Sequence, residues 1–129
     1  MTSLYERLGG QAAISATVDL MYQKILADNR ISHFFRGVNM DHLRAKQKAF
    51  LAMAFGGPSN YTGKDLREGH KYLVVRGLTD KHFDAVGEHI QAALKELGVA
   101  EPLIAEVLAI AESVRDQVLN KKPATAAIL

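Results

Sequence analysis

Apolar side chains recur every three or four residues through most of the chain, which is the spacing of one helix face. Between residues 11 and 27, one such stripe consists of Ile14, Val18, Met21, Tyr22 and Ile25. No segment alternates with a sustained period of two, as a half-buried strand would. The sequence therefore predicts an all-α fold.

Capping residues and glycines predict where the helices begin and end. Ser3 and Glu6 have the spacing of a capping box, which predicts the start of a short helix. Gly9-Gly10 predicts its end. Asn39 is a suitable N-cap for a helix over residues 40–55. Its predicted inner stripe is Met40, Leu43, Gln47, Phe50, Leu51 and Ala54.

The second half of the chain predicts three more helices. A short one carries Leu66, His70 and Leu73 at helical spacing and ends at Gly77. The next begins at Thr79 and ends at Gly98, with the apolar face Phe83, Val86, Ile90, Ala93 and Leu97. Pro102 suits the first turn of a last helix, whose stripe is Leu103, Val107, Ala111, Val114 and Val118.

The length of 129 residues suits a single domain, predicted over residues 1–120 with a flexible tail over 121–129. The formal net charge of +2 is scattered, so we expect no nucleic-acid partner. No apolar run reaches the roughly 20 residues of a membrane helix, so we expect no membrane partner and a cytoplasmic location. The absence of cysteine excludes thiolate nucleophiles and Cys-ligated metals.

The histidines do not form a metal site by their spacing. His82 and His89 lie seven positions apart, or about 10.5 Å along one helix, which is too far to share an ion. Carboxylates do not supply ligand spacing either, so zinc and di-iron sites are poorly supported. A nucleophile elbow typical of hydrolases is also missing.

Two polar side chains interrupt apolar stripes: Tyr22 in the first long helix and Gln47 in the second. A buried phenol or amide needs a hydrogen-bond partner. The pattern leaves two interpretations open, since both side chains could be satisfied at helix edges or by each other, or both could face a ligand. A glycine-rich connection, Gly56 to Gly63, comes before His70, and long connections in compact domains often serve a function.

Five fragments occur in an order and spacing that resemble the group I (N-type) truncated haemoglobins. They are Leu4-Tyr5-x-x-Leu8-Gly9-Gly10, His33-Phe34-Phe35, Gln47-x-x-Phe50, Ala54-Phe55-Gly56-Gly57 and Glu68-Gly69-His70. Each fragment is weak alone, but together they are specific, and the resemblance covers residues 3 to 120.

The resemblance implies a truncated globin, a two-over-two helical sandwich around haem b, with an irregular segment over residues 58–66. By this resemblance, His70 binds the iron, and Tyr22 and Gln47 act on the bound gas. The remaining haem contacts that it implies are Phe35, Leu43, Lys46, Phe50, Leu51, Leu66, Leu73, Phe83 and Val86. Some relatives attach haem covalently through a His in the last helix, whereas no His follows His89 here. We therefore expect one non-covalent haem per chain.

The implied function is reversible binding of oxygen, with nitric oxide and carbon monoxide as further ligands. Oxidation of nitric oxide to nitrate would need an unidentified reductase. We expect a monomer. Leu51 stands where some members proposed to guide gas through a tunnel have a Phe.

Lys46 separates two versions of this function. We expect its ammonium to pair with a haem propionate. In the alternative, neutral Lys46 binds iron, and the protein is a six-coordinate redox or sensing haem protein. Removing its proton near neutral pH costs roughly 4 kcal/mol from an ordinary pKa of about 10.4. A third class is a helical interaction module without a cofactor.

Overall fold

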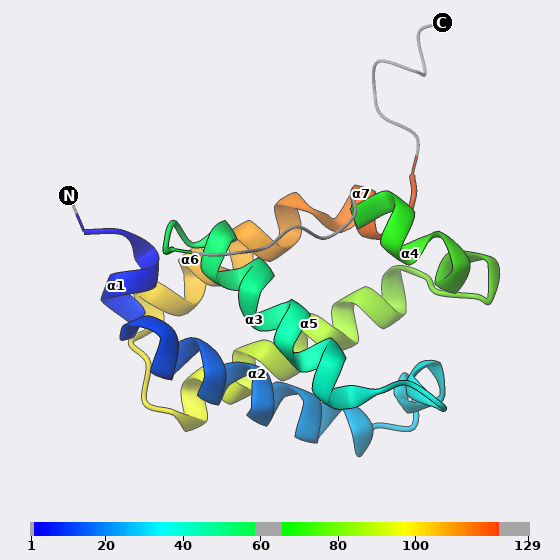
Figure 1. Cartoon of the computed structure of the whole chain (residues 1–129), viewed down its shortest axis with the longest axis horizontal. Coiled ribbons are helices and arrows are strands. Elements are labelled where there is room, and N and C mark those ends of the chain that lie inside the picture. The colour runs from blue at the N-terminus through cyan, green and yellow to red at the C-terminus, as the bar shows by residue number, and fades with distance from the viewer. Residues whose placement is uncertain (1, 59–65, 122–129) are drawn as a thin grey trace, which may run out of the picture.

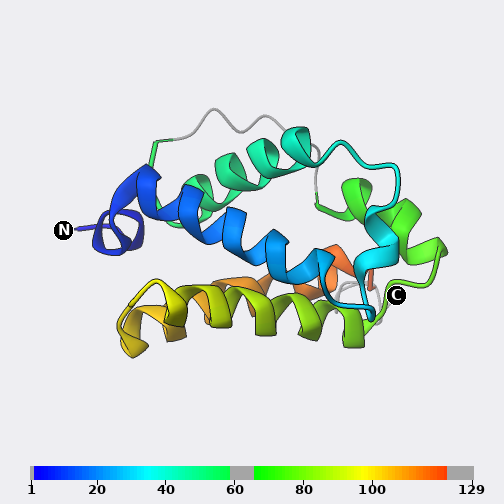
Figure 2. The same cartoon turned by 90° about the horizontal axis from the view of Figure 1, so that it is seen from below.

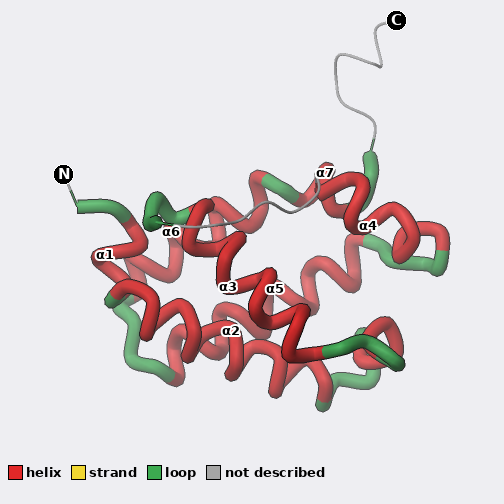
Figure 3. Tube along the Cα trace, in the orientation of Figure 1, coloured by secondary structure: helices red, strands yellow, loops and turns green. Residues whose placement is uncertain are grey.

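The computed structural model describes residues 2–58 and 66–121, and within these residues it is helical with no strand (Figure 3). The helices are α1 (Leu4–Leu8), α2 (Gly10–Leu26), the 3-10 helix η1 (Ser32–Phe35), α3 (Met40–Ala54), α4 (Leu66–Val75), α5 (Asp80–Glu96), α6 (Glu101–Ser113) and α7 (Arg115–Val118). The predicted all-α class is confirmed.

The four long helices form two layers, with α2 and α3 in one layer and α5 and α6 in the other (Figures 1 and 2). Helix α2 is central because it packs on both α3 and α5. The short helices α4 and α7 pack on each other at the end of the molecule where α5 begins (Figure 1). This is the two-over-two arrangement that the sequence predicts.

The core lies where α2 packs on α5 and α3, and Ile104 and Val107 of α6 join it. Aliphatic side chains of α2 are almost completely buried there, and the stripe predicted from their spacing is the stripe that packs. The members predicted from the sequence are all buried: Ile14, Val18, Met21, Tyr22 and Ile25.

The predicted caps are present. The Ser3 hydroxyl accepts a hydrogen bond from the Glu6 amide over 3.1 Å, and the Asn39 side chain accepts one from the His42 amide over 3.1 Å. These bonds satisfy amides that have no partner inside their own helix. The short helix and the α3 start therefore lie where local sequence places them.

Two of the sequence fragments meet at the start of α1. The Tyr5 amide donates to the Phe55 carbonyl over 2.9 Å, and the Tyr5 ring lies against the backbone of Gly57. A Cβ at position 57 would come within 2.3 Å of the Tyr5 ring, so only glycine fits there without a shift. Packing thus explains Gly57, and Gly56 beside it has a φ of 85°, in the left-handed region that favours glycine.

Two details differ from the expectation. Leu97 is 44% exposed because it lies beyond the last residue of α5, at the C-cap, whereas Leu94 inside the helix is buried. The predicted last helix is two helices, separated at Val114. The Ser113 hydroxyl donates to the Ile110 carbonyl, and such local bonds compete with the helical ladder.

The ends of the predicted domain are described only in part. Residues 59–65 of the expected irregular segment and residues 122–129 of the expected tail lie outside the described residues. Lys121 is described, and its ammonium lies 2.8 Å from Asp80. None of the described helices is long and apolar enough to cross a membrane.

Candidate functional site

His70 lies on the half-buried inner face of α4, and its ring orientation is fixed by the backbone. Its Nδ1 lies 2.9 Å from the Leu66 carbonyl oxygen. Because a carbonyl only accepts, Nδ1 must carry the proton and donate it. The Nε2 lone pair is then available for a metal, which is the arrangement found in most metal-binding histidines.

The other four histidines are engaged elsewhere or exposed. His82 accepts the Thr79 amide through Nδ1 over 2.9 Å and caps α5, while burial and the neighbouring His33 lower its pKa. His89 Nε2 lies 2.7 Å from an Asp28 carboxylate oxygen. His33 and His42 are exposed, and the described residues contain no cluster of three metal ligands. Among the five histidines, His70 is therefore the best candidate for a metal ligand.

Tyr22 of α2 places a polar hydroxyl within the otherwise apolar core. The residue is 6% exposed, and its ring meets Phe35 edge-on with 6.0 Å between centroids. Burial raises the pKa of its phenol well above the ordinary range, so the hydroxyl keeps its proton and can donate.

The Tyr22 hydroxyl has no hydrogen bond to the described residues. It is not sealed in the core either, because no fully buried polar side-chain atom of the described chain lacks a partner. Its oxygen therefore reaches open space beside the core, where a ligand could accept its proton. Gln47, half-buried on α3, likewise has no hydrogen bond within the described chain.

The predicted apolar contacts differ in their surroundings. Four of them are half-buried against the core: Phe35, Leu43, Phe50 and Val86. Leu51 is fully part of the core. Leu66 and Leu73 are half-buried beside His70 on α4, and none of the residues on this helix is fully buried. Lys46 is exposed on α3.

Phe83 is held by a residue that the sequence did not single out. The Arg115 guanidinium lies 4.6 Å from the Phe83 ring centroid, within the range of a cation–π contact. Arg115 also pairs with Asp80 and Asp84 of α5, and with Glu112. Only the Glu112 to Arg115 spacing is visible in the sequence, because the other partners are brought together by the fold.

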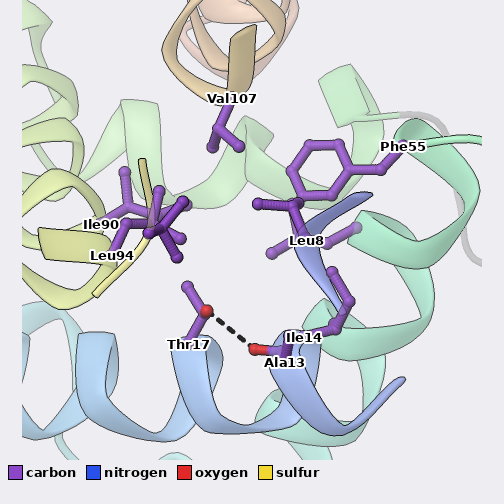
Figure 4. A pocket seen from close by; sticks show the side chains of 10 residues that line it. Leu8, Ala13, Ile14, Thr17, Phe55, Ile90, Leu94 and Val107 are labelled. Atoms are coloured by element: carbon purple, nitrogen blue, oxygen red, sulfur yellow. Dashed lines mark hydrogen bonds between the residues drawn. The ribbon is translucent and has the colours of Figure 1, made fainter. Parts of the chain in front are cut away.

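A small void lies within the core, where residues of α1, α2, α3, α5 and α6 meet (Figure 4). It is just large enough for one water-sized molecule, and its lining is almost entirely apolar. The Thr17 hydroxyl is turned to the Ala13 carbonyl at 2.8 Å, so its proton is used within α2. The lining comprises Leu8, Ala13, Ile14, Thr17, Leu51, Phe55, Ile90, Leu94, Val99 and Val107.

Comparisons with known proteins agree with this geometry. The family described as bacterial-like globin matches residues 3–120. A group 1 truncated haemoglobin of Synechocystis is 54% identical over 112 residues, covering 86% of this chain and 90% of the relative. That of Tetrahymena thermophila is 44% identical over 119 residues, covering 92% and 96%. The chain belongs to the group 1 truncated haemoglobins.

A solved structure supports the same assignment. The 2/2 haemoglobin of Synechococcus, in the cyanomet state with covalently attached haem, has a TM-score of 0.89 and 45% identity, covering 93% of this chain and 100% of the other. This truncated haemoglobin is thus a haem-binding globin, and globins bind small gases such as oxygen. Within residues 2–58 and 66–121, the free Nε2 of His70, the Tyr22 hydroxyl without a hydrogen bond and the half-buried apolar side chains fit a haem.

Proposed function

We propose that His70 is the proximal ligand of one non-covalent haem b, and that this haem binds oxygen reversibly. The observation that carries the assignment is the bond between His70 Nδ1 and the Leu66 carbonyl, because it leaves Nε2 free. When bound, the haem supplies an iron that takes a diatomic gas. No His follows His89 in the sequence, which argues against the covalent attachment named for the Synechococcus relative.

Tyr22 and Gln47 are proposed to hold oxygen in the pocket by donating hydrogen bonds. Burial keeps the Tyr22 hydroxyl protonated, so it would donate a hydrogen bond to a gas ligand that carries partial negative charge. A charge-assisted bond contributes about 1.5–3 kcal/mol. At 1.4 kcal/mol per factor of ten, one such bond slows oxygen loss roughly ten- to a hundredfold.

Oxidation of nitric oxide is a second proposed activity. Leu51 lines the void and is also expected to contact the haem, and on this basis we propose that the void adjoins the haem pocket. Nitric oxide could then occupy the void before it reacts with dioxygen. Nitric oxide and dioxygen together have the atoms of nitrate, and a reductase would return one electron to the iron after each turnover. Reaction of the oxygenated protein with nitric oxide, followed by nitrate assay, tests this activity.

Lys46 is proposed to pair with a haem propionate. Its exposed position on α3 suits a side chain whose stem covers the haem edge while its ammonium stays in water. Iron ligation by Lys46, with a redox or sensing role, is the competing proposal. The monomeric state and the cytoplasmic location stay predictions.

The absorption spectrum of purified protein, with and without His70→Ala, tests the central proposal. The wild type should show a haem Soret band that shifts with oxygen and carbon monoxide. His70→Ala should lose stable haem, while the matched control His42→Ala, on an exposed histidine, should keep the wild-type spectrum. A normal spectrum in His70→Ala would exclude His70 as the ligand.

A further inference from the structure

The outer face of α4 carries the two most exposed large hydrophobic side chains among the described residues. Val75 is 80% exposed and Tyr72 is 71% exposed, and they lie on the side of the helix opposite His70. Lys71 and Arg76 flank them, and the Arg76 guanidinium lies 5.8 Å from the Tyr72 ring centroid. We call these four residues, Lys71, Tyr72, Val75 and Arg76, the α4 outer face.

The cations of this face lack the ion pairs that most other lysines and arginines of the described chain form. Elsewhere, lysines and arginines are commonly paired, as in Arg7 with Glu106 and Lys24 with Glu96. Lys71 and Arg76 form no salt bridge within residues 2–58 and 66–121. Lys81, in the first turn of the following helix, forms none there either. Exposed Glu68 lies one helical turn before Tyr72 on the same side of α4, so among the described residues the face is an exposed apolar centre whose three neighbouring cations outnumber its one carboxylate.

This charge decides between the partners that such a face could bind. Two copies of the chain meeting through α4 would bring the same cations together, and like charges across an interface are repulsive. A partner with an acidic surface would gain attraction at each cation, and Tyr and Arg are the residue types that contribute most at protein interfaces. The face therefore fits an acidic protein better than a second copy.

The position of the face indicates the class of that protein. The inner side of the same short helix carries His70, so a partner docked on the outer side is separated from the proposed haem only by α4. We propose that the α4 outer face docks an acidic one-electron carrier protein that reduces the ferric haem. The carrier loses one electron and the iron gains it, becoming ferrous. This proposal rests on the proposed function, in which His70 holds the haem.

Binding is tested by titrating isotope-labelled ferric holoprotein with oxidised plant-type ferredoxin, an acidic one-electron carrier, and following the amide NMR signals. At low salt, the shifted amides should include residues 71–76, and raising the salt should weaken binding because the contact is ionic. Shifts confined to other elements, or no binding by the wild type, would overturn the proposal.

Charge reversal supplies the second test. Lys71→Glu and Arg76→Glu should each weaken ferredoxin binding and slow reduction by reduced ferredoxin about tenfold at low salt. The matched control Lys95→Glu makes the same charge change at the other end of α5 and should behave as wild type. Equal losses in the control, or none in Lys71→Glu and Arg76→Glu, would refute docking at this face.

The apolar centre and the haem are tested separately. Tyr72→Ser should weaken ferredoxin binding while leaving reduction by dithionite, a small reductant, unchanged; unchanged ferredoxin binding would contradict the proposal. Self-association of the wild type that Val75→Asp abolishes would favour a second copy and overturn it. A missing Soret band in the wild type would instead refute the proposed haem function, so the two failures are distinguishable.

Discussion

The Asn120 side-chain amide donates a hydrogen bond to the Arg67 carbonyl over 2.8 Å, and so ties the end of the described chain to the first turn of the helix that carries His70. A second hydrogen bond joins the same two segments, because the Arg67 guanidinium donates to the Lys121 carbonyl. Asn120 has a φ of 55°, in the left-handed region where Asn is tolerated better than most residues. This clasp holds α4 against α7.

The first prediction is that Asn120→Gly loosens α4 while keeping the left-handed backbone. Loss of one hydrogen bond costs about 1 kcal/mol. Haem should therefore leave the protein about fivefold faster. Transfer of haem to an apoglobin acceptor measures this rate, and the iron–histidine stretching band of the deoxy protein should broaden or move. Wild-type behaviour of both would show that the clasp does not position His70.

The second prediction concerns the two proposed gas contacts. Tyr22→Phe and Gln47→Leu should each speed oxygen dissociation roughly ten- to a hundredfold, for the hydrogen-bond energy given above. Carbon monoxide accepts hydrogen bonds weakly, so its release should barely change and serves as the internal control. The two effects should not simply add, because the side chains share one ligand. Equal changes for both gases in stopped-flow measurements would indicate a steric role.

The third prediction separates the two roles of Lys46. Propionate pairing predicts that Lys46→Ala keeps the wild-type ferric spectrum near neutral pH and loosens the haem only slightly, because exposed ion pairs contribute little. Iron ligation predicts a low-spin ferric form that grows as the pH rises and the amine loses its proton. That form would be absent from Lys46→Ala. Ferric spectra of both proteins over a pH series decide between them.

Sequence reasoning was most successful where the signal is local. The caps at Ser3 and Asn39, and the stripe from Ile14 to Ile25, depend on neighbours within a few turns, and all are present. The helix that carries His70 is also present. The bond from His70 to the Leu66 carbonyl is local as well, because the two residues are four positions apart in one helix.

The parts that the sequence left undetermined depend on contacts between distant segments. Arg115 of α7 forms ion pairs with Asp80 and Asp84 of α5, and the spacing of residues within one helix cannot predict such contacts. Gly57 appears in the sequence as a loop residue, whereas its function is to admit the Tyr5 ring. Leu97 follows the helical period but lies at a helix end, where the period no longer determines burial.

The last prediction concerns acid stability at the corner between α2 and η1. The Asp28 side chain is 11% exposed and is bound by Arg30 and by His89. These bonds, those of Arg30 first, hold the pKa of the Asp28 carboxyl well below its ordinary range. In the folded protein Asp28 thus stays ionised at a pH where the unfolded chain takes up a proton, so the unfolded state binds more protons.

The sign follows from this difference. A carboxyl whose folded pKa is lowered stabilises the fold above the unfolded pKa, and this contribution is lost as the pH falls toward the folded pKa. The ordinary pKa of Asp is about 4, so wild type should exceed Asp28→Asn in stability at pH 7, with the difference shrinking progressively below about pH 4. Urea unfolding of both proteins over this range measures it. Asp19→Asn, which removes a carboxylate that is half-exposed beside Lys48, is the matched control and should show a smaller pH-dependent difference. A constant gap between wild type and Asp28→Asn from pH 7 to acid would mean that Asp28 stabilises the corner by packing and not by its charge.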